Sequence, residues 1–545
     1  YWSVEADLVT PKQETFHAAL SAIDGATLDK FAIADQQQAD KLFAALKDGQ
    51  YTVSAVTSSE STKHPLPPFR TSTLQQEANR RLGFSAKLTM RLAQQLYEGV
   101  ELGRAGHQGL ITYMRTDSLN LSENFLAEAG QFIVKEYGAK YGLAKPRYFK
   151  NTSKGAQEAH EAIRPTEASR TPESVASHLN PQQLKLYRLI WSRAVASQMA
   201  PAQVASAAIE VTEAAAKYTF RATGQTITFD GFLKVYPTST KEVILPVVTK
   251  GELVTATAIT PEQHFTQPPA RYTDASLIKI LEEKGIGRPS TYAPTIGTII
   301  SRGYVTRDRK ALLPTDIAFI VIDLLVEHFP NIVDYAFTAT MEGELDAIAA
   351  GEVAWRPVIK TFYDAFAANL ETKLETVTKV NATAEVTDEV CDKCGQLMVI
   401  KIGRFGKFLS CSGWPECKNA KPLDANGDAA PVETVDETCP KCGQPMVMKV
   451  GRFGKFIACS NYPTCKTTKQ TNASTGVTCP ECKAGEIVER RSRRGTFYGC
   501  DAYPKCKFTL WAKPTGEKCA TCGALMVRAK GDTVQCSNKE CATRQ

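Results

Sequence analysis

Sixteen cysteines, all of them after residue 390, constrain the fold of this 545-residue chain more than any other feature. They form four sets, and in each set a Cys-x-x-Cys pair is followed by a second close pair 13 to 17 residues later. Four thiolates at this spacing are typical of a closed, tetrahedral zinc site. The predicted ligands are Cys391, Cys394, Cys411 and Cys417, then Cys439, Cys442, Cys459 and Cys465, then Cys479, Cys482, Cys500 and Cys506, and finally Cys519, Cys522, Cys536 and Cys541.

We therefore predict four small zinc-ribbon β modules, each folded around a structural zinc ion. A disulfide framework fits less well, because the long body before the tail contains no cysteine. A tail of metal-free thiols is the alternative. The same cysteine usage indicates a reducing, cytoplasmic compartment. The modules are expected at residues 391–420, 439–468, 479–510 and 519–545.

The cysteine sets are internal repeats that also carry cations and aromatic residues. Residues 401–417 recur as residues 449–465, and both copies contain Gly-Arg-Phe-Gly-Lys-Phe. The third copy keeps Arg493, Phe497 and Tyr503. Aromatic rings can stack on unpaired bases while cations contact the backbone, so the pattern predicts a single-stranded nucleic acid ligand. The fourth set lacks these aromatics, and we expect it to bind nucleic acid less or to contact a protein.

Charge separates the tail from the rest of the chain. From Cys391 onward there are 25 Lys and Arg against 14 Asp and Glu, whereas the first 390 residues hold 40 against 44. A basic tail on an acidic body indicates a polyanionic partner, although a merely solvated surface is also compatible. The longest apolar run, residues 317–325, is short and contains Asp323, so we expect no membrane span.

The first 376 residues alternate between strand-rich and helical blocks. Strand signals fall in residues 1–66 and 200–265, so we predict one strand-built domain that is interrupted by a helical domain, residues 67–199. A second helical block, residues 266–376, and a linker, residues 377–390, follow. The predicted helices are 36–46, 72–82, 86–97, 122–141, 181–199, 275–284, 289–302, 314–328 and 341–372, and the predicted strands are 1–8, 51–57, 205–211, 218–222 and 226–229.

The connection between the helices 86–97 and 122–141 contains a candidate reactive tyrosine. If residues 109–118 are extended, Tyr113, Arg115 and Asp117 share one face. A tyrosine hydroxyl becomes a good nucleophile once it is ionised, and a nearby cation favours that form. The same cation could stabilise charge on a phosphodiester under attack. The alternative is a structural strand with Tyr113 in the core and Arg115 paired to Asp117.

A glycine-rich stretch, residues 285–292, is a candidate phosphate site. Pro289 suits the first turn of a helix, and Arg288, Ser290 and Thr291 supply hydrogen-bond donors. An ordinary helix cap explains the stretch equally well. It is not a Gly-x-x-x-x-Gly-Lys-Ser/Thr loop, and no such loop occurs in the sequence, so we predict no nucleotide-hydrolysing motor.

Two further stretches have both a phosphate-binding and a structural interpretation. Three neighbouring hydroxyls, at positions 71–73, open a predicted helix and could hold a phosphate or simply cap the helix. His160 and Arg164 lie one turn apart if residues 158–164 are helical, and they could also bind phosphate. The stretch begins like a His-Glu-x-x-His zinc protease motif, but Arg164 stands where the second histidine would be.

Together these stretches resemble one family, the type IA DNA topoisomerases of bacteria. The resemblance implies a multidomain α+β fold. In it, a strand-rich arch, a helical tyrosine domain and part of a helical base form a toroid, and zinc ribbons follow. It covers nearly the whole chain. Its carriers are residues 68–75, 82–84, 109–118, 157–166, 229–232, 264–272, 285–293, 302–305 and 337–342, together with the four-cysteine repeats.

In that family the tyrosine at the position of Tyr113 attacks a single strand of DNA and forms a 5′-phosphotyrosyl link. Strand passage and religation then relax negatively supercoiled DNA without ATP. The resemblance implies that Arg115 stabilises the scissile phosphate. It implies a monomer that acts on single-stranded or negatively supercoiled DNA in the cytoplasm at the nucleoid, and it allows RNA polymerase as a partner of the ribbons. The implied DNA contacts are Thr112, Asp117, His160, Arg164, Arg288, Ser290, Thr291 and Arg302.

One departure from the family concerns magnesium. The family begins with a toprim domain whose Asp-x-Asp-x-Glu motif binds Mg²⁺, and this sequence contains no such motif. It opens with Tyr1 and Trp2 and first shows a methionine at Met90, and we expect no leader peptide. We therefore expect a fragment that cannot complete the relaxation cycle alone. The alternatives are a non-catalytic DNA-binding module and an adaptor that docks on RNA polymerase.

Overall fold

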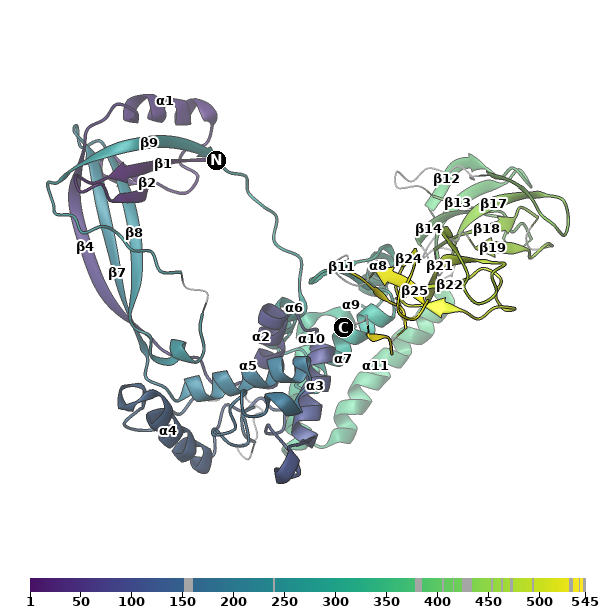
Figure 1. Ribbon diagram of the computed structural model, residues 1–545, viewed down its shortest axis with the longest axis horizontal. Coiled ribbons are helices and arrows are strands. Elements are labelled where there is room, and N and C mark those ends of the chain that lie inside the picture. Colours follow the sequence, from purple (N-terminus) through teal and green to yellow (C-terminus); the bar gives the residue numbers. More distant parts are fainter. Residues whose placement is uncertain are drawn as a thin grey trace. The chain divides into compact units, whose positions relative to one another are not determined.

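The computed structural model (Figure 1) contains two compact units, Tyr1–Thr378 and Lys379–Gln545. In the part of the chain that the structure describes, no helix is both long enough and apolar enough to cross a membrane. The described residues are 1–150, 160–238, 241–377, 385–403, 406–414, 416–423, 434–451, 454–461, 464–470, 474–492, 495–528, 533–538 and 540–542.

A seven-stranded antiparallel sheet interleaves two segments that are far apart in the sequence. In Figure 1 the purple strands from the start of the chain lie beside teal strands from beyond residue 200. The first strand in the order also pairs with β2, so the sheet closes on itself. The order is β1 (Trp2–Val9), β9 (Leu253–Gln263), β4 (Tyr51–Lys63), β7 (Ala202–Glu213), β8 (Tyr218–Phe229), β2 (Thr15–Ile23) and β3 (Ala26–Thr27).

The core of this sheet is built by period-two alternation and by one helix, α1 (Gln36–Leu46). Along β1, Val4, Ala6 and Leu8 are buried while their neighbours are not. The helix begins at Asp35, whose carboxylate accepts a hydrogen bond from the Gln38 backbone N–H. It packs against β1 and β9.

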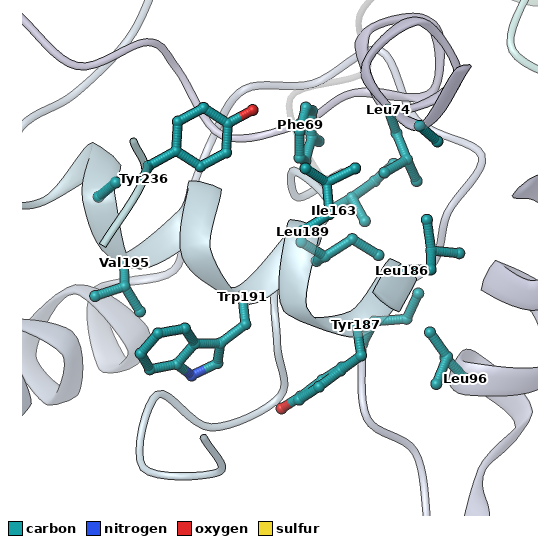
Figure 2. Close-up of a cluster of buried hydrophobic side chains, with 14 of the residues drawn as sticks. Phe69, Leu74, Leu96, Ile163, Leu186, Tyr187, Leu189, Trp191, Val195 and Tyr236 are labelled. Atoms are coloured by element: carbon teal, nitrogen blue, oxygen red, sulfur yellow. The ribbon is translucent and has the colours of Figure 1, made fainter. Parts of the chain in front are cut away.

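The second core gathers around α5 (Pro181–Ser197). Figure 2 shows Phe69, Ile163 and Leu96, from three other segments of the chain, around this helix. The helix is buried over most of its C-terminal half, which explains why its apolar residues cover more than one face. The other elements of this region are α2 (Thr71–Glu77), a π-helical turn (Ala78–Leu82), α3 (Ala86–Glu98), β5 (Val100–Glu101), β6 (His107–Gln108) and α4 (Glu123–Tyr137).

A third group of elements extends from residue 274 to residue 376. Its small apolar core joins Ile278, Tyr292 and Ile296 to Ala86 at the start of α3. The elements are α6 (Asp274–Glu283), α7 (Tyr292–Ser301), β10 (Val305–Asp308), β11 (Ala311–Pro314), α8 (Asp316–His328), α9 (Pro330–Val333), α10 (Tyr335–Ala349) and α11 (Trp355–Thr376).

The second unit consists of four small antiparallel sheets, one for each cysteine set. We call them ribbons 1 to 4. Ribbon 1 contains β12 (Glu385–Val390), β13 (Leu397–Gly403), β14 (Gly406–Cys411) and β15 (Ala420–Pro422). Ribbon 2 contains β16 (Thr434–Thr438), β17 (Pro445–Gly451), β18 (Gly454–Cys459) and β19 (Thr468–Gln470). Ribbon 3 contains β20 (Ser474–Thr478), β21 (Glu486–Ser492), β22 (Gly495–Cys500) and β23 (Thr509–Leu510), and ribbon 4 contains β24 (Pro514–Lys518), β25 (Leu525–Arg528) and β26 (Val534–Cys536).

Ribbons 3 and 4 share part of one hydrophobic core. Leu525 of ribbon 4 is buried in the cluster that surrounds Cys479 and Ile487 of ribbon 3. Strand β24 packs against β20. The neighbouring Met526 instead packs against the cysteines of ribbon 4 itself. One face of β25 therefore packs against ribbon 3, and the other packs against the cysteines of ribbon 4.

Several element predictions are wrong in their boundaries. The predicted strands 218–222 and 226–229 are one strand, β8, because β7 pairs with both parts. The predicted helix 341–372 is two helices, α10 and α11, which are separated around Gly351, where the backbone has a left-handed φ of 77°.

Two further boundaries differ from the predictions. Helix α7 begins at Tyr292 instead of residue 289, so Pro289 lies in the turn before the helix. Strand β12 occupies the end of the predicted linker because it pairs with β13 of ribbon 1. Residues 378–384 of that linker lie outside the described residues.

We expect Leu525→Ala to loosen ribbon 3 as well as ribbon 4. Removing a buried leucine side chain costs roughly 2–5 kcal/mol, and part of this loss falls on the neighbouring ribbon. The measurement is the alkylation rate of Cys479 and Cys500, followed by mass spectrometry of the peptides. The matched control is Met526→Ala, which should speed alkylation in ribbon 4 only. Unchanged alkylation of Cys479 and Cys500 in Leu525→Ala would show that the ribbons are independent.

Candidate active site and zinc sites

The tyrosine stretch, residues 109–118, has alternating burial without forming a strand. Tyr113 is 45% exposed, whereas Met114 and Thr116 are buried. Arg115 is also exposed, and Asp117 is half-buried. The predicted shared face is therefore present. The alternative of a core tyrosine is wrong, and in the described residues no ion pair joins Arg115 to Asp117.

Two threonine hydroxyls hold the backbone of this stretch from its two sides. The Thr112 hydroxyl donates to the Ala162 carbonyl at 2.7 Å and accepts from the Arg164 N–H at 3.0 Å. The Thr71 hydroxyl lies 2.7 Å from the Met114 carbonyl and accepts from the Thr116 N–H at 2.9 Å. They add to two ladder-type backbone bonds, from the Thr112 N–H to the Arg164 carbonyl and from the Thr166 N–H to the Leu110 carbonyl.

Close approach to α3 fixes the start of the stretch. The Leu110 N–H donates to the Leu96 carbonyl at 2.8 Å. A Cβ atom on Gly109 would lie 2.8 Å from the Tyr97 carbonyl oxygen, which is too close for any other residue. The Tyr97 ring meets the Tyr113 ring edge to face, with the ring centres 5.2 Å apart. Helix α3 thus supports the exposed phenol without covering it.

Residues 160–166 are extended, so the predicted helical turn with His160 and Arg164 on one face is wrong. The backbone N–H groups of Ala162 and Ile163 donate to the carbonyls of Asn120 and Phe69. His160 is exposed and lies two residues from Ala162, which contacts the tyrosine stretch. Residues 157–159 of this stretch lie outside the described residues.

The Arg164 guanidinium is already engaged with protein groups. It pairs with Glu161 at 2.6 Å and donates to the Ser122 hydroxyl at 3.2 Å. It also donates to the backbone carbonyls of Pro165 and Thr166. Arg164 therefore stabilises the chain next to the tyrosine stretch through these contacts.

The three hydroxyls at the start of α2 also bind protein groups. Thr71 holds the tyrosine stretch, Ser72 donates to Glu282 at 2.7 Å, and Thr73 exchanges hydrogen bonds with the backbone of Arg70. The helix has only 7 residues. The structural interpretation of this stretch therefore explains every hydroxyl.

A small cleft brings the tyrosine stretch together with the glycine-rich stretch. Its volume is about 230 Å³, and its walls include Asp117 and Thr116 from the first, and Gly287 and Arg288 from the second. Glu282 lines the same cleft. Two of the predicted site residues, Asp117 and Arg288, thus meet at one opening.

Arg288 is held by α10 and by its own turn. Its guanidinium pairs with Asp346 at 2.6 Å, and this contact raises the pKa of Arg288. It also donates to the Gly287 carbonyl at 2.8 Å. The Thr291 hydroxyl accepts from the Arg288 N–H at 2.8 Å, which is a turn-stabilising contact. Because Gly287 has a left-handed φ of 83°, the turn can close this tightly.

The remaining predicted contacts and one buried tyrosine complete this region. Ser290 and Arg302 are exposed, the latter directly after the end of α7. Tyr292 is buried, and burial together with the negative charge of Glu282 raises its pKa to about 12. Tyr292 is therefore a neutral packing residue, whereas Tyr113 is exposed.

Each cysteine set forms a compact cluster that fits one tetrahedral zinc ion. Within each set all four sulfur atoms lie within 4.8 Å of one another. A tetrahedral ion with Zn–S bonds of about 2.3 Å needs sulfur separations of about 3.8 Å. The closest sulfur separations run from 3.2 Å for Cys394 and Cys411 to 3.7 Å for Cys391 and Cys417, at this value or somewhat below it. They are far longer than a disulfide bond.

Ribbon 3 displays a row of aromatic and cationic side chains on one face of its sheet. Arg490 and Phe497 are direct cross-strand partners, so they share a face. The Trp511 ring lies 6.1 Å from the Phe497 ring, and the Arg490 guanidinium lies 5.7 Å from the Tyr503 ring. A Cβ atom on Gly499 would contact both Phe497 and Arg490, so a small residue fits beneath the row.

Known proteins share both units. A family model described as DNA topoisomerase matches residues 1–360. A model described as topoisomerase DNA binding C4 zinc finger matches residues 388–426, 436–474 and 476–515. The solved structure of full-length topoisomerase I from Thermotoga maritima is similar, with 34% sequence identity and a TM-score of 0.62, and the match covers 79% of this chain and 68% of that chain.

The chain belongs to the bacterial type IA DNA topoisomerases. The predicted fold class is confirmed: a mixed α+β body is followed by four zinc ribbons. DNA is its partner, and the four cysteine clusters are structural C4 zinc sites. Ribbon 4 keeps its cysteines but lies outside the three matches to the zinc-finger model.

Sequence reasoning missed two features of this topoisomerase. Glu282 contacts Ser72, from which it is separated by 210 positions, and no sequence pattern signals such a pair. Trp511 lies next to Phe497, whereas the equivalent position holds Pro422 in ribbon 1 and Gln470 in ribbon 2. An alignment of the repeats could therefore have identified the extra tryptophan of ribbon 3.

We expect the purified topoisomerase to carry about four zinc ions per chain, one for each cluster. Cys411→Ser should lower the zinc content by about one ion, whereas the neighbouring Ser412→Ala should not change it. Metal analysis of the dialysed protein measures this. Chelation should unfold the ribbons and leave the first unit folded, because that unit has its own cores. A zinc content that stays the same in Cys411→Ser would contradict the assignment.

Proposed function

We propose that Tyr113 is the nucleophile with which this topoisomerase breaks one strand of DNA. The supporting observation is that the phenol is exposed on a stretch whose backbone is held on both sides by threonine hydroxyls. A nucleophile needs access to its substrate and a fixed position, and Tyr113 has both. Arg115 lies on the same face and supplies positive charge near the reacting group.

The chemistry is a transfer of one phosphodiester bond. The Tyr113 oxygen loses its proton and bonds to phosphorus, and the bond from phosphorus to the 3′ oxygen breaks. The 3′ oxygen takes up a proton and leaves as a hydroxyl, while the 5′ phosphate stays on the tyrosine. Arg115 stabilises the negative charge that builds on the phosphate oxygens.

Religation reverses these steps after another strand has passed through the break. The phosphotyrosyl bond keeps the energy of the broken phosphodiester, so the cycle needs no ATP. This agrees with a sequence that contains no Walker loop. Relaxation of negatively supercoiled DNA follows, because such DNA is the easiest to open into single strands.

The other predicted contacts would bind the strand around the break. Asp117 and Arg288 line the cleft beside the tyrosine stretch. His160, Ser290 and Arg302 are exposed and could meet phosphate oxygens. Thr112, Arg164 and Thr291 already bind protein groups, so we propose that they act on DNA mainly by holding the backbone in place.

Magnesium is implied by the family resemblance, and its acidic site has no counterpart in these residues. The motif Asp-x-Asp-x-Glu is absent from the sequence. We therefore assign no Mg²⁺ ligand here, and we expect relaxation of supercoiled plasmid to need that acidic site in addition.

Tyr113→Phe should abolish covalent attachment to DNA. The assay uses the intact protein and a single-stranded oligonucleotide labelled at its 3′ end, and the reaction is stopped with denaturant. A 5′-phosphotyrosyl link leaves the label on the protein, whereas a link to the other side of the break leaves it on free DNA. The matched control is Tyr97→Phe, whose ring packs against Tyr113. Labelled protein in the Tyr113→Phe lane would refute the proposal.

The same experiment tests the main alternative. A non-catalytic DNA-binding module, or an adaptor for RNA polymerase, would give no labelled protein with any variant. Ribbon 4 is the candidate for protein contacts, because it lacks the aromatic row of ribbon 3. We propose RNA polymerase only as a secondary partner, and we expect the protein to act as a monomer.

We also propose that ribbons 1 to 3 hold single-stranded DNA, and that ribbon 3 binds it most tightly. Bases stack on exposed aromatic rings while cations contact the phosphates. In ribbon 3, Trp511 and Tyr503 are 65% and 60% exposed, at the two ends of the row. Ribbons 1 and 2 have a Lys–Phe strand pair at the position of Arg490 and Phe497, without a third ring at the position of Trp511.

Trp511→Ala should weaken binding of a single-stranded oligonucleotide by about 5-fold to 150-fold. This range corresponds to the loss of roughly 1–3 kcal/mol for one stacked base. Fluorescence anisotropy of a labelled oligonucleotide gives the affinity. The dependence on salt should stay the same, because no charge is removed. Trp355→Ala, which removes a similarly exposed tryptophan outside the ribbons, is the control and should leave the affinity unchanged.

A further inference from the structure

Helix α6 is attached to the tyrosine-bearing region by an acidic residue near each end. At its start, the fully buried Asp274 accepts from the Ala86 N–H of α3 at 2.8 Å and pairs with Arg307 at 2.6 Å. Near its end, Glu282 contacts the first turn of α2. The helix is therefore held against both α3 and α2.

Glu282 binds the two residues on either side of Thr71. One carboxylate oxygen lies 2.8 Å from the Arg70 guanidinium and accepts from the Ser72 hydroxyl at 2.7 Å. The other oxygen lies 3.5 Å from the Gln76 amide, one turn further along α2. The Arg70 and Glu282 side chains are only 18% and 24% exposed, so solvent screens this pair less than an ordinary surface pair.

Thr71 itself contacts the tyrosine stretch, which carries Tyr113 and Arg115. Its N–H donates to the Thr116 carbonyl at 2.9 Å, and its hydroxyl binds the backbone of Met114 and Thr116. These two residues flank Arg115, and Tyr113 comes directly before Met114. A continuous set of contacts thus connects the Glu282 carboxylate to the backbone that carries the phenol and the guanidinium.

We propose that Glu282 is a positioning residue for the cleavage step, acting through Arg70, Ser72 and Thr71 on the tyrosine stretch. The proposal rests on the proposed function of Tyr113. The carboxylate fixes the first turn of α2, and the first turn of α2 fixes the backbone around Arg115. Displacement of a catalytic group by about 1 Å can cost about 100-fold in rate, so a contact of this kind controls chemistry without touching DNA.

The ion pair also has an electrostatic consequence for the cleft. Glu282 lines the opening that Asp117 and Arg288 share, where a phosphate would approach. A lone carboxylate there would repel a polyanion, and Arg70 offsets that charge. Removing only the charge of Glu282 should therefore leave DNA binding as tight as before or tighter. General damage to the fold would weaken binding instead, so the two effects are distinguishable.

The test compares Glu282→Gln with Glu283→Gln in the intact protein. Glu283 is the next residue in α6, and among the residues that the structure describes its one ion pair is with Lys279 on the helix surface at 3.6 Å, so it is a matched control. Two quantities are measured for each variant: the rate of covalent adduct formation at saturating oligonucleotide, and the affinity in a Tyr113→Phe background. We expect Glu282→Gln to form adduct roughly 10-fold to 100-fold more slowly with no loss of affinity.

Arg70→Gln removes the same ion pair by changing its cationic partner. This second variant keeps the test valid if Glu282→Gln fails to fold. Its slowing of cleavage should not add to that of Glu282→Gln in the double variant, because both remove one interaction. A normal adduct rate in Glu282→Gln, or a parallel fall of rate and affinity, would overturn the positioning role. Adduct in the wild type and in Glu283→Gln, and its absence in Tyr113→Phe, would leave the proposed function intact in that case.

Discussion

The structure around the candidate site depends on two threonine hydroxyls, which bind backbone groups where the short ladder of residues 110–112 and 164–166 ends. An exposed tyrosine on irregular backbone would normally be mobile, because few main-chain hydrogen bonds would hold it. Here the Thr71 hydroxyl binds the backbone of Met114 and Thr116, the Thr112 hydroxyl binds the backbone of Ala162 and Arg164, and each hydroxyl both donates and accepts. The stretch can therefore present Tyr113 to solvent while the backbone of Met114 and Thr116, which follow it, is held by hydrogen bonds.

The two units are stabilised in different ways. The first unit buries large apolar clusters around the closed sheet and around α5. Each ribbon is too small for such a core, and cysteines make up half or more of the buried residues in each ribbon's cluster. The cluster of ribbon 3 also contains Leu525 of ribbon 4. A ribbon without the aromatic row thus supports the ribbon that has it.

Local sequence patterns predicted most helices and strands, and they failed where contacts with distant segments determine the backbone conformation. The helices 36–46, 86–97 and 181–199 were predicted from apolar spacing, and the structure shows that they begin at the caps Asp35, Ser85 and Asn180. The prediction that residues 158–164 form a helical turn fails, because residues 160–166 are extended and the Ala162 and Ile163 N–H groups bond to distant Asn120 and Phe69. No local propensity contains that information.

The sequence by itself determined the chemistry that the chain can carry: sixteen thiolates in four tetrahedral sets, and a phenol and a guanidinium on alternate positions of one stretch. These depend on residue type and spacing, which are local. Only the tertiary structure decided which polar groups are already used, such as Thr112 and Arg164, and which distant carboxylate holds the site, namely Glu282. Hydrogen bonds and ion pairs need contact within a few ångströms, and between such residues the fold alone sets that distance.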